Sequence, residues 1–146
     1  MATYSFMDVT ASFTGTTGAF DLGYGSANSE EGITVTMTEA KNTMTVGADG
    51  EVMHSLHAGK SGTITVTLLK TSPVNKKLSL AYNAQSLSSS LWGNNVIVIR
   101  NHVSGDTTTA RTVAFQKQPD HANAKVGSTV SWVFDCGKID QLLGEF

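Results

Sequence analysis

Apolar and polar residues alternate one by one along several short segments, and this period-2 pattern predicts β-strands. Residues 33–39 read ITVTMTE and residues 63–69 read TITVTLL, so each segment places its apolar side chains on one face and its threonines on the other. Residues 43–46 (TMTV) continue the pattern after a break at residues 41–42. Residues 33–46 therefore read as two strands joined by a tight turn. A strand with one apolar face and one hydroxyl face is typical of an antiparallel sheet with one face in water.

Three further segments extend the predicted sheet. Residues 96–100 (VIVIR) lack polar alternation, which indicates a strand that is buried on both faces or lies at an interface. Residues 110–117 (ARTVAFQK) read as its return strand, and residues 129–136 (TVSWVFDC) alternate again.

A helix start stands out between the second threonine-rich segment and the VIVIR strand. Ser72 is a good N-cap residue and Pro73 suits the first helical position. Apolar residues follow at helical spacing, which predicts a helix over about 73–85. We therefore expect a mainly β fold, an antiparallel β-sandwich or barrel with one α-helix, in a single domain that spans residues 1–146.

Two segments are predicted to reach beyond this sheet. Residues 47–62 (GADGEVMHSLHAGKSG) have glycines near both ends and read as a long projecting hairpin or loop. Its residues available for contact with a neighbour are Asp49, Glu51, Val52, Met53, His54, Leu56, His57 and Lys60. The chain also ends on an apolar segment, and we expect this tail to dock on its own core or on a neighbour. The tail residues are Ile139, Leu142, Leu143 and Phe146.

Charge is low and unevenly distributed. Charged residues are 15% of the chain, against about 25% in ordinary globular proteins, and 19 Thr, 15 Ser and 14 Gly supply much of the polar surface. This composition indicates a surface largely covered by other protein, although secreted lectins and adhesins share it. Residues 1–51 carry a net charge of −6 and the remainder carries +4. Either these charges are scattered over loops, or an acidic surface on one copy meets a basic surface on the next.

Whole-chain properties exclude several classes of protein. The net charge of −2 excludes a nucleic-acid binder that works through bulk positive charge. A single cysteine excludes an internal disulfide framework and a multi-cysteine metal site. We find neither an apolar run of about 20 residues that would span a membrane nor the basic and apolar regions of a signal peptide. We expect a soluble protein made in a reducing compartment.

Candidate catalytic and cofactor-binding residues give no consistent site. Residues 59–61 (GKS) resemble the end of a phosphate-binding loop, but His54 stands where that motif needs glycine and a strand follows where it needs a helix. His54 and His57 lack a third metal ligand at a suitable spacing. Cys136 adjoins Asp135, which would raise the pKa of a nucleophilic thiol. The paired acids at residues 30–31 read as solvated loop residues. We expect no enzyme, no cofactor and no metal site.

Aromatic residues leave one binding function open. They are Tyr4, Tyr24, Trp92, Phe115 and Trp132, and they would serve either as a platform on which sugars stack or as core and interface packing.

Five stretches carry a resemblance to a known family. They are residues 4–12 (YSFMDVTAS), 21–33 (DLGYGSANSEEGI), 56–62 (LHAGKSG), 69–75 (LKTSPVN) and 114–119 (AFQKQP). Together they resemble a small structural protein of tailed bacteriophages that was long catalogued as a domain of unknown function and is taken to be the tail tube protein. The resemblance spans essentially the whole chain.

This resemblance implies a β-sandwich or barrel subunit that forms hexameric rings. The inner sheets of six subunits would join into one barrel around a lumen, and the rings would stack into a tube through which DNA passes. The protein would lie in the virion tail after synthesis in the bacterial host cytoplasm. Its implied partners are copies of itself and the tail sheath, tape-measure and baseplate or terminator proteins. The family carries no catalytic motif, and a contractile sheath surrounds the tube in many relatives.

The residue patterns fit this implication at three places. A hydroxyl face of low charge suits a wet lumen that gives DNA nothing to bind, and the acidic N-terminal third would repel phosphates. We therefore assign the lumen face to Thr34, Thr36, Thr38, Thr63, Thr65 and Thr67. The projecting hairpin would reach a neighbouring ring, and ring closure with stacking needs two different patches on each subunit. The alternatives are a carbohydrate-binding or adhesion module and another tail component such as a terminator.

Overall fold

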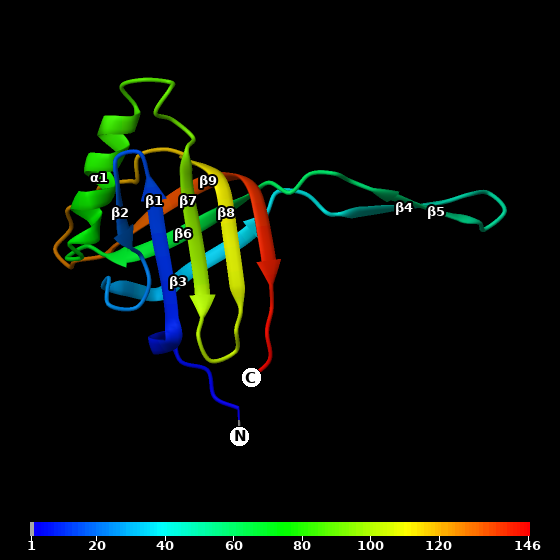
Figure 1. The fold of residues 1–146 in the computed structure, drawn as a ribbon, viewed down its shortest axis with the longest axis horizontal. Coiled ribbons are helices and arrows are strands. Elements are labelled where there is room, and N and C mark those ends of the chain that lie inside the picture. The colour runs from blue at the N-terminus through cyan, green and yellow to red at the C-terminus, as the bar shows by residue number, and fades with distance from the viewer. Residues whose placement is uncertain (1) are drawn as a thin grey trace.

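The computed structural model describes residues 2–146 as a seven-stranded antiparallel sheet that curls into a half-barrel, with one helix packed on it and a hairpin that projects from it (Figure 1). The strand order across the sheet is β2-β1-β7-β8-β9-β6-β3, and β4 pairs with β5 in the hairpin. The strands are β1 (Val9–Gly15), β2 (Gly18–Asp21), β3 (Asn28–Met37), β4 (Asn42–Val46), β5 (Val52–Leu56), β6 (Gly62–Leu69), β7 (Asn95–Asn101), β8 (Thr107–Phe115) and β9 (Thr129–Leu142). The helices are a short 3-10 helix (Phe6–Asp8) and α1 (Val74–Gln85). The predicted mainly β, barrel-like antiparallel fold with one helix is confirmed.

The concave face of the half-barrel holds the hydrophobic core. Phe13, Phe115 and Phe134 meet there with ring centroids 5.1–5.8 Å apart. α1 covers this face and buries Val74 and Leu78 against it. The period-2 alternation of the strands therefore sends one set of side chains into the core and leaves the other set on the convex face.

The helix begins one residue later than predicted, with Pro73 as the cap residue and Val74 as the first helical residue. Ser72 Oγ accepts a hydrogen bond from the Val74 N–H (3.3 Å) and donates to the Ser26 carbonyl (2.5 Å). The hydroxyl therefore satisfies a free N–H at the start of α1 and fastens that start to the loop before β3.

The strand pairing predicted within residues 33–46 is wrong. Residues 43–46 do not pair with residues 33–39. They form β4, which pairs with β5, so the projecting segment begins near residue 38 rather than at residue 47. The hairpin turn is made instead by residues 47–50, where Gly50 takes the positive φ of +89° that glycine tolerates.

The last strand is longer than predicted and runs to Leu142 instead of ending at Cys136. Gly137 allows this continuation, because a Cβ there would lie 3.0 Å from the Cβ of Thr112 on the paired strand β8. β9 keeps its pairing with β8 past this point, while its pairing with β6 ends at Cys136. Ile139 consequently lies inside the core of its own chain.

Candidate assembly surfaces

The threonines assigned to a lumen face lie mostly on the convex face of β3 and β6. Thr34 is directly opposite Thr65, and Thr36 is directly opposite Thr63. Thr67 continues the row and lies 3.4 Å from the hydroxyl of Ser131 on β9. The structure thus brings five of the six residues onto one face, where Thr67 is buried and the other four are exposed or half-buried.

Thr38 lies apart from this row. It follows the end of β3, where its N–H donates to the Ser61 carbonyl (3.0 Å) at the base of the projecting hairpin. It therefore belongs to the hairpin base rather than to the sheet face.

The hydroxyl face extends further than the sequence analysis predicted. On β1, Thr10, Ser12 and Thr14 alternate with core residues, and Ser12 and Thr14 lie opposite Val98 and Val96 of β7. The signal was present in residues 9–14 (VTASFT), whose alternation matches that of residues 33–39. Hydroxyls therefore recur on the convex face at β1, separated from those of β3 and β6 by Val96, Val98 and Arg100 of β7 and by charged residues of β8 and β9.

Charges on this face gather near the hairpin base. Asp140 lies 3.0 Å from Lys60 Nζ, 3.8 Å from Arg111 Nη1 and 3.9 Å from Lys138 Nζ. The hydrogen bond from Lys60 and the surrounding positive charges hold the pKa of the Asp140 carboxyl below its usual value. The Asp140 carboxylate thus lies near three positively charged side chains, and the cluster has a net positive charge.

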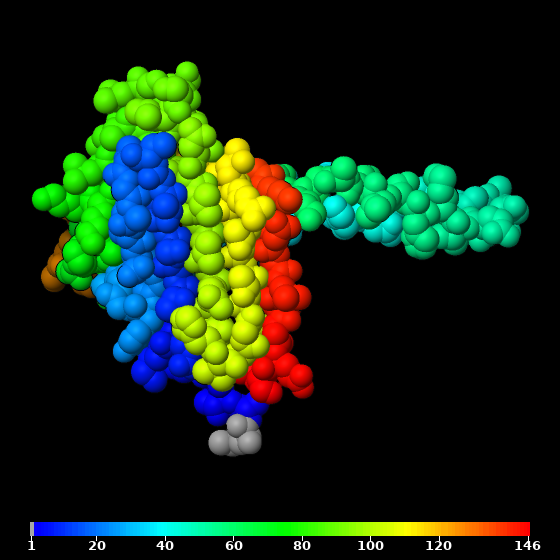
Figure 2. All heavy atoms as spheres, in the orientation of Figure 1, coloured from blue at the N-terminus to red at the C-terminus, as the bar shows by residue number. Residues whose placement is uncertain are grey.

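The projecting hairpin, which we call the arm (residues 38–61), stands clear of the body (Figure 2). Pairing places Val46 opposite Val52 and Met44 opposite His54, so these side chains share one face with Leu56. All four apolar residues of this face are exposed, and Leu56 is 81% exposed. The opposite face carries mainly hydroxyls and holds Thr43, Thr45, Met53 and Ser55. The arm is therefore amphipathic, with its apolar face in solvent.

The segment predicted to project, residues 47–62, contains only the second strand of this arm. Met44 and Val46, which the pattern predicts in the sheet, belong to its first strand. Residues 47–50 (GADG) carry the glycines and the aspartate that favour a hairpin turn, and this was the available signal.

The arm histidines make hydrogen bonds to neighbouring side chains. His54 Nδ1 lies 3.2 Å from Asn42 Nδ2, and His57 Nε2 lies 2.7 Å from Thr43 Oγ1. Among residues 2–146, no group of three or more His, Cys, Asp or Glu side chains is arranged to hold a metal ion. The histidines therefore link the two strands of the arm.

The residues assigned to a docking tail separate into two environments. Ile139 is buried, while Leu142, Leu143 and Phe146 are exposed. The end of the chain is held by the β7–β8 loop, because Gly144 N–H donates to Asp106 Oδ1 (2.6 Å) and Glu145 N–H donates to the Ser104 carbonyl (3.0 Å). The Phe146 ring also packs edge-on against Tyr4, with centroids 6.4 Å apart.

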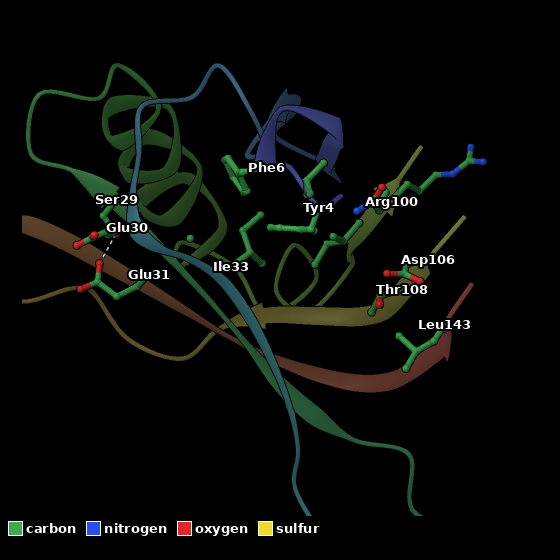
Figure 3. Close-up of a pocket in the computed structure, with 14 residues that line it drawn as sticks. Tyr4, Phe6, Ser29, Glu30, Glu31, Ile33, Arg100, Asp106, Thr108 and Leu143 are labelled. Atoms are coloured by element: carbon green, nitrogen blue, oxygen red, sulfur yellow. Dashed lines mark hydrogen bonds between the residues drawn. The ribbon is translucent and has the colours of Figure 1, made fainter. Parts of the chain in front are cut away.

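A groove of about 490 Å³ opens at the end of the half-barrel near both termini (Figure 3). Apolar side chains including Phe6 and Ile33 line it, and Glu30 and Glu31 lie at one end. Glu31 accepts a hydrogen bond from Ser29 Oγ (2.5 Å), which lowers the pKa of its carboxyl. Both acids are exposed to solvent as expected, but they lie in strand β3 and not in a loop. A lowered pKa favours the ionised carboxylate over a general acid.

Neither the cysteine nor the tryptophans form a binding site. Burial, with a smaller effect of Asp135, raises the pKa of the Cys136 thiol to about 11, so the thiolate nucleophile is scarce at neutral pH. Trp132 is buried and donates its Nε1–H to Asn75 Oδ1 (3.0 Å). Trp92 packs against Tyr82 and the core residue Phe115. Both tryptophans therefore contribute to internal packing.

In the described part of the chain, we find no helix with the length and apolar character needed to cross a membrane.

Comparison with known proteins identifies the family of this chain. No curated protein sequence matches the chain significantly. Its fold is similar to the tube-terminating cap of the anti-feeding prophage, with a TM-score of 0.59 and 6% identity over 99% of this chain and 95% of that chain. A chain of the anti-feeding prophage baseplate aligns with a TM-score of 0.47 and 16% identity over 97% of each chain. The family model of the bacteriophage PhiTE tail tube protein matches residues 1–144. The chain therefore belongs to the bacteriophage PhiTE tail tube protein family and is a structural component of a virion tail.

Proposed function

We propose that this chain assembles with copies of itself into hexameric rings, which stack into the tail tube that conducts DNA during ejection. The observation that carries the proposal, together with the family, is the amphipathic arm. Its apolar face includes Met44, Val46, Val52 and Leu56, all of which are exposed. A two-stranded hairpin is marginally stable alone in water, and a contiguous apolar surface favours burial against a partner. A neighbouring copy would bury this face and stabilise the arm.

The convex hydroxyl face supports a role as the wall of a conduit. Thr34, Thr36, Thr63 and Thr65 present hydroxyls without charge. Tight DNA binding depends on Lys and Arg neutralising phosphates, so a wall of threonines would let DNA pass without holding it.

Contacts in such an assembly are heterologous, since the arm of one copy meets a different surface of the next. Heterologous contacts generate closed rings or open filaments depending on the rotation between copies, and a stacked-ring tube uses both. We further propose contacts with the tail sheath, tape-measure and baseplate or terminator proteins, and a purely structural, non-enzymatic role without a cofactor.

A tail terminator is the second candidate. The fold similarity to a tube-terminating cap covers nearly the whole of both chains. A terminator would close the tube with a single ring instead of forming a long stack. A carbohydrate-binding module has less support, because Trp92 and Trp132 pack within the protein.

Negative-stain electron microscopy of the purified protein over a concentration series tests the proposal. Long hollow tubes of uniform width are the expected result. Isolated rings that never stack would favour the terminator. A monomer at every concentration, even with a baseplate preparation added to nucleate growth, would contradict self-assembly into tubes.

A further inference from the structure

A second groove, of about 560 Å³, lies where the arm leaves the body. Met37, Ile139 and Leu142 contribute apolar surface to it, and Lys41 and Lys60 lie along it. We call this site the root groove. Met37 and Leu142 remain exposed to solvent there.

Positive charge gathers on the side of the root groove formed by Asp140, while the acidic Glu39 lies beside Gly59 at the arm side. Lys60, Arg111 and Lys138 all lie within 4 Å of the single carboxylate of Asp140. Their side chains are about half exposed, so the excess positive charge faces solvent. The root groove thus combines apolar surface with a cationic rim.

The tip of the arm carries negative charge. Asp49 and Glu51 are both exposed there, next to the exposed pair Val46 and Val52. Asp49 Oδ1 accepts the Glu51 N–H (3.1 Å), and Gly47 N–H donates to the Glu51 carbonyl (2.7 Å), so the turn holds the tip in a defined shape. An acidic, apolar-flanked tip is therefore presented at the far end of an extended hairpin.

We propose that the arm tip of one copy of this chain seats in the root groove of a second copy. Val46 and Val52 pack on Met37 and Leu142 of the second copy, and Asp49 and Glu51 meet the cationic rim. This inference rests on the proposed self-assembly and adds a defined contact to it.

The arm cannot make this contact within one chain, because it extends straight away from its own root (Figure 1). At about 3.3 Å per residue, the roughly eleven residues from Thr38 to Asp49 span about 36 Å. A tip-to-root contact therefore sets the distance between the roots of linked copies at no more than about 36 Å. Complementary charge also steers association and disfavours wrong pairings.

A charge swap tests the contact in the full-length chain. The variant D49K/E51K reverses the tip and the variant R111E/K138E reverses the rim. Each variant alone should need a roughly tenfold or higher protein concentration to form tubes, since like charges then face each other. An equimolar mixture of the two should co-assemble, because the reversed tip fits the reversed rim. The proposal would be overturned if either variant formed tubes at the wild-type concentration, or if the mixture needed as high a protein concentration as each variant alone.

Matched controls separate the specific contact from a general effect of charge. Asp120→Lys and K76E/K77E reverse exposed charges away from the arm and the root groove, and both should assemble as the wild type does. Circular dichroism and urea unfolding of every variant confirm that the subunit remains folded.

Cross-linking tests the contact independently of tube formation. E51C protein is mixed with K138C protein and treated with a bis-maleimide, and K76C replaces K138C in the control. A dimer from the first mixture alone is the expected result. Equal yields in both mixtures would overturn the tip-to-root contact even if wild-type tubes form. Wild-type protein that never forms tubes but gives the specific dimer would contradict the proposed tube and leave the contact supported.

Discussion

Gln85 and Asn95 exchange two hydrogen bonds within the core: Gln85 Nε2 donates to Asn95 Oδ1 and Asn95 Nδ2 donates to Gln85 Oε1, each at 2.8 Å. Both side chains are fully buried. Asn95 Nδ2 also donates to the Val113 carbonyl, and Gln85 Nε2 donates to Thr17 Oγ1, each at 3.0 Å. The pair therefore connects the end of α1 with β7, β8 and the β1–β2 turn.

Gln85→Met should lower the free energy of unfolding by about 2–3 kcal/mol, because it leaves the buried Asn95 Oδ1 without a partner and removes one of the two bonds of Asn95 Nδ2. Urea denaturation measures the change. Asn94→Ala is the control, since Asn94 is exposed and its substitution should cost no more than about 0.5 kcal/mol. Equal losses for the two variants would show that the buried pair contributes nothing special to stability.

The Gln85–Asn95 pair also shows where sequence reasoning reaches its limit. The alternation in residues 33–37 and 63–68 is a local property, and it assigned Thr34 and Thr65 to one face correctly. Which strand pairs with which is not local, so Met44 was placed in the sheet instead of the arm. The same limit applies to the cluster around Asp140, whose hydrogen-bond partner Lys60 is 80 residues away in sequence.

Ile139 lies in the core of its own chain, one of the two docking places expected for the tail, but the sequence does not show that it belongs to the last strand. The strand continues through Gly137, and glycine in a strand pattern reads from sequence as an end or a bulge. Only the β8–β9 pairing on both sides of Gly137, and the close approach of Thr112 there, show that the strand passes this point.

Stability should fall between pH 9 and 11 because of Cys136. Burial raises the pKa of the thiol from 9.0 to about 11 in the folded protein. In this window the unfolded chain loses the thiol proton while the folded chain keeps it, so rising pH favours unfolding. The contribution is fully present below pH 9 and disappears as the pH passes 11, with a size of about 3 kcal/mol. Urea unfolding of the wild type and Cys136→Ala across this range measures it, and parallel pH profiles would contradict it.

Removal of the arm should leave a folded subunit that cannot assemble. Thr38 N–H donates to the Ser61 carbonyl at the arm base, so residues 39–60 can be replaced by an Asn-Gly turn that keeps this pairing. Unfolding should remain cooperative, because the core contains no residue of the removed segment. Sedimentation velocity should show a monomer at concentrations where the wild type forms tubes. Full-length tubes from the shortened chain would contradict a role of the arm in assembly.

Lysines on the convex face should make the tube retain DNA. The double variant T36K/T65K adds positive charge to β3 and β6 on the face assigned to the lumen. Tubes should still form and should bind DNA in low salt, with binding lost as the salt concentration rises. S88K/S89K adds the same charge to an exposed loop beyond α1 and should not trap DNA inside the tube. Nuclease protection distinguishes enclosed from surface-bound DNA. If DNA in T36K/T65K tubes were not protected, β3 and β6 would not line the lumen.

Truncation after Leu142 should weaken assembly more than it weakens the fold. The last four residues hold the exposed side chains of Leu143 and Phe146, and their bonds to the β7–β8 loop lie at the surface. Loss of these contacts should lower the unfolding free energy by no more than about 1 kcal/mol. Removal of residues 139–146 should lower the unfolding free energy by about 2–4 kcal/mol more, because Ile139 is buried. Thermal unfolding and sedimentation of both truncations separate the two effects. If the shorter truncation lowered the melting temperature but left tube formation intact, the tail would serve its own subunit and not a neighbour.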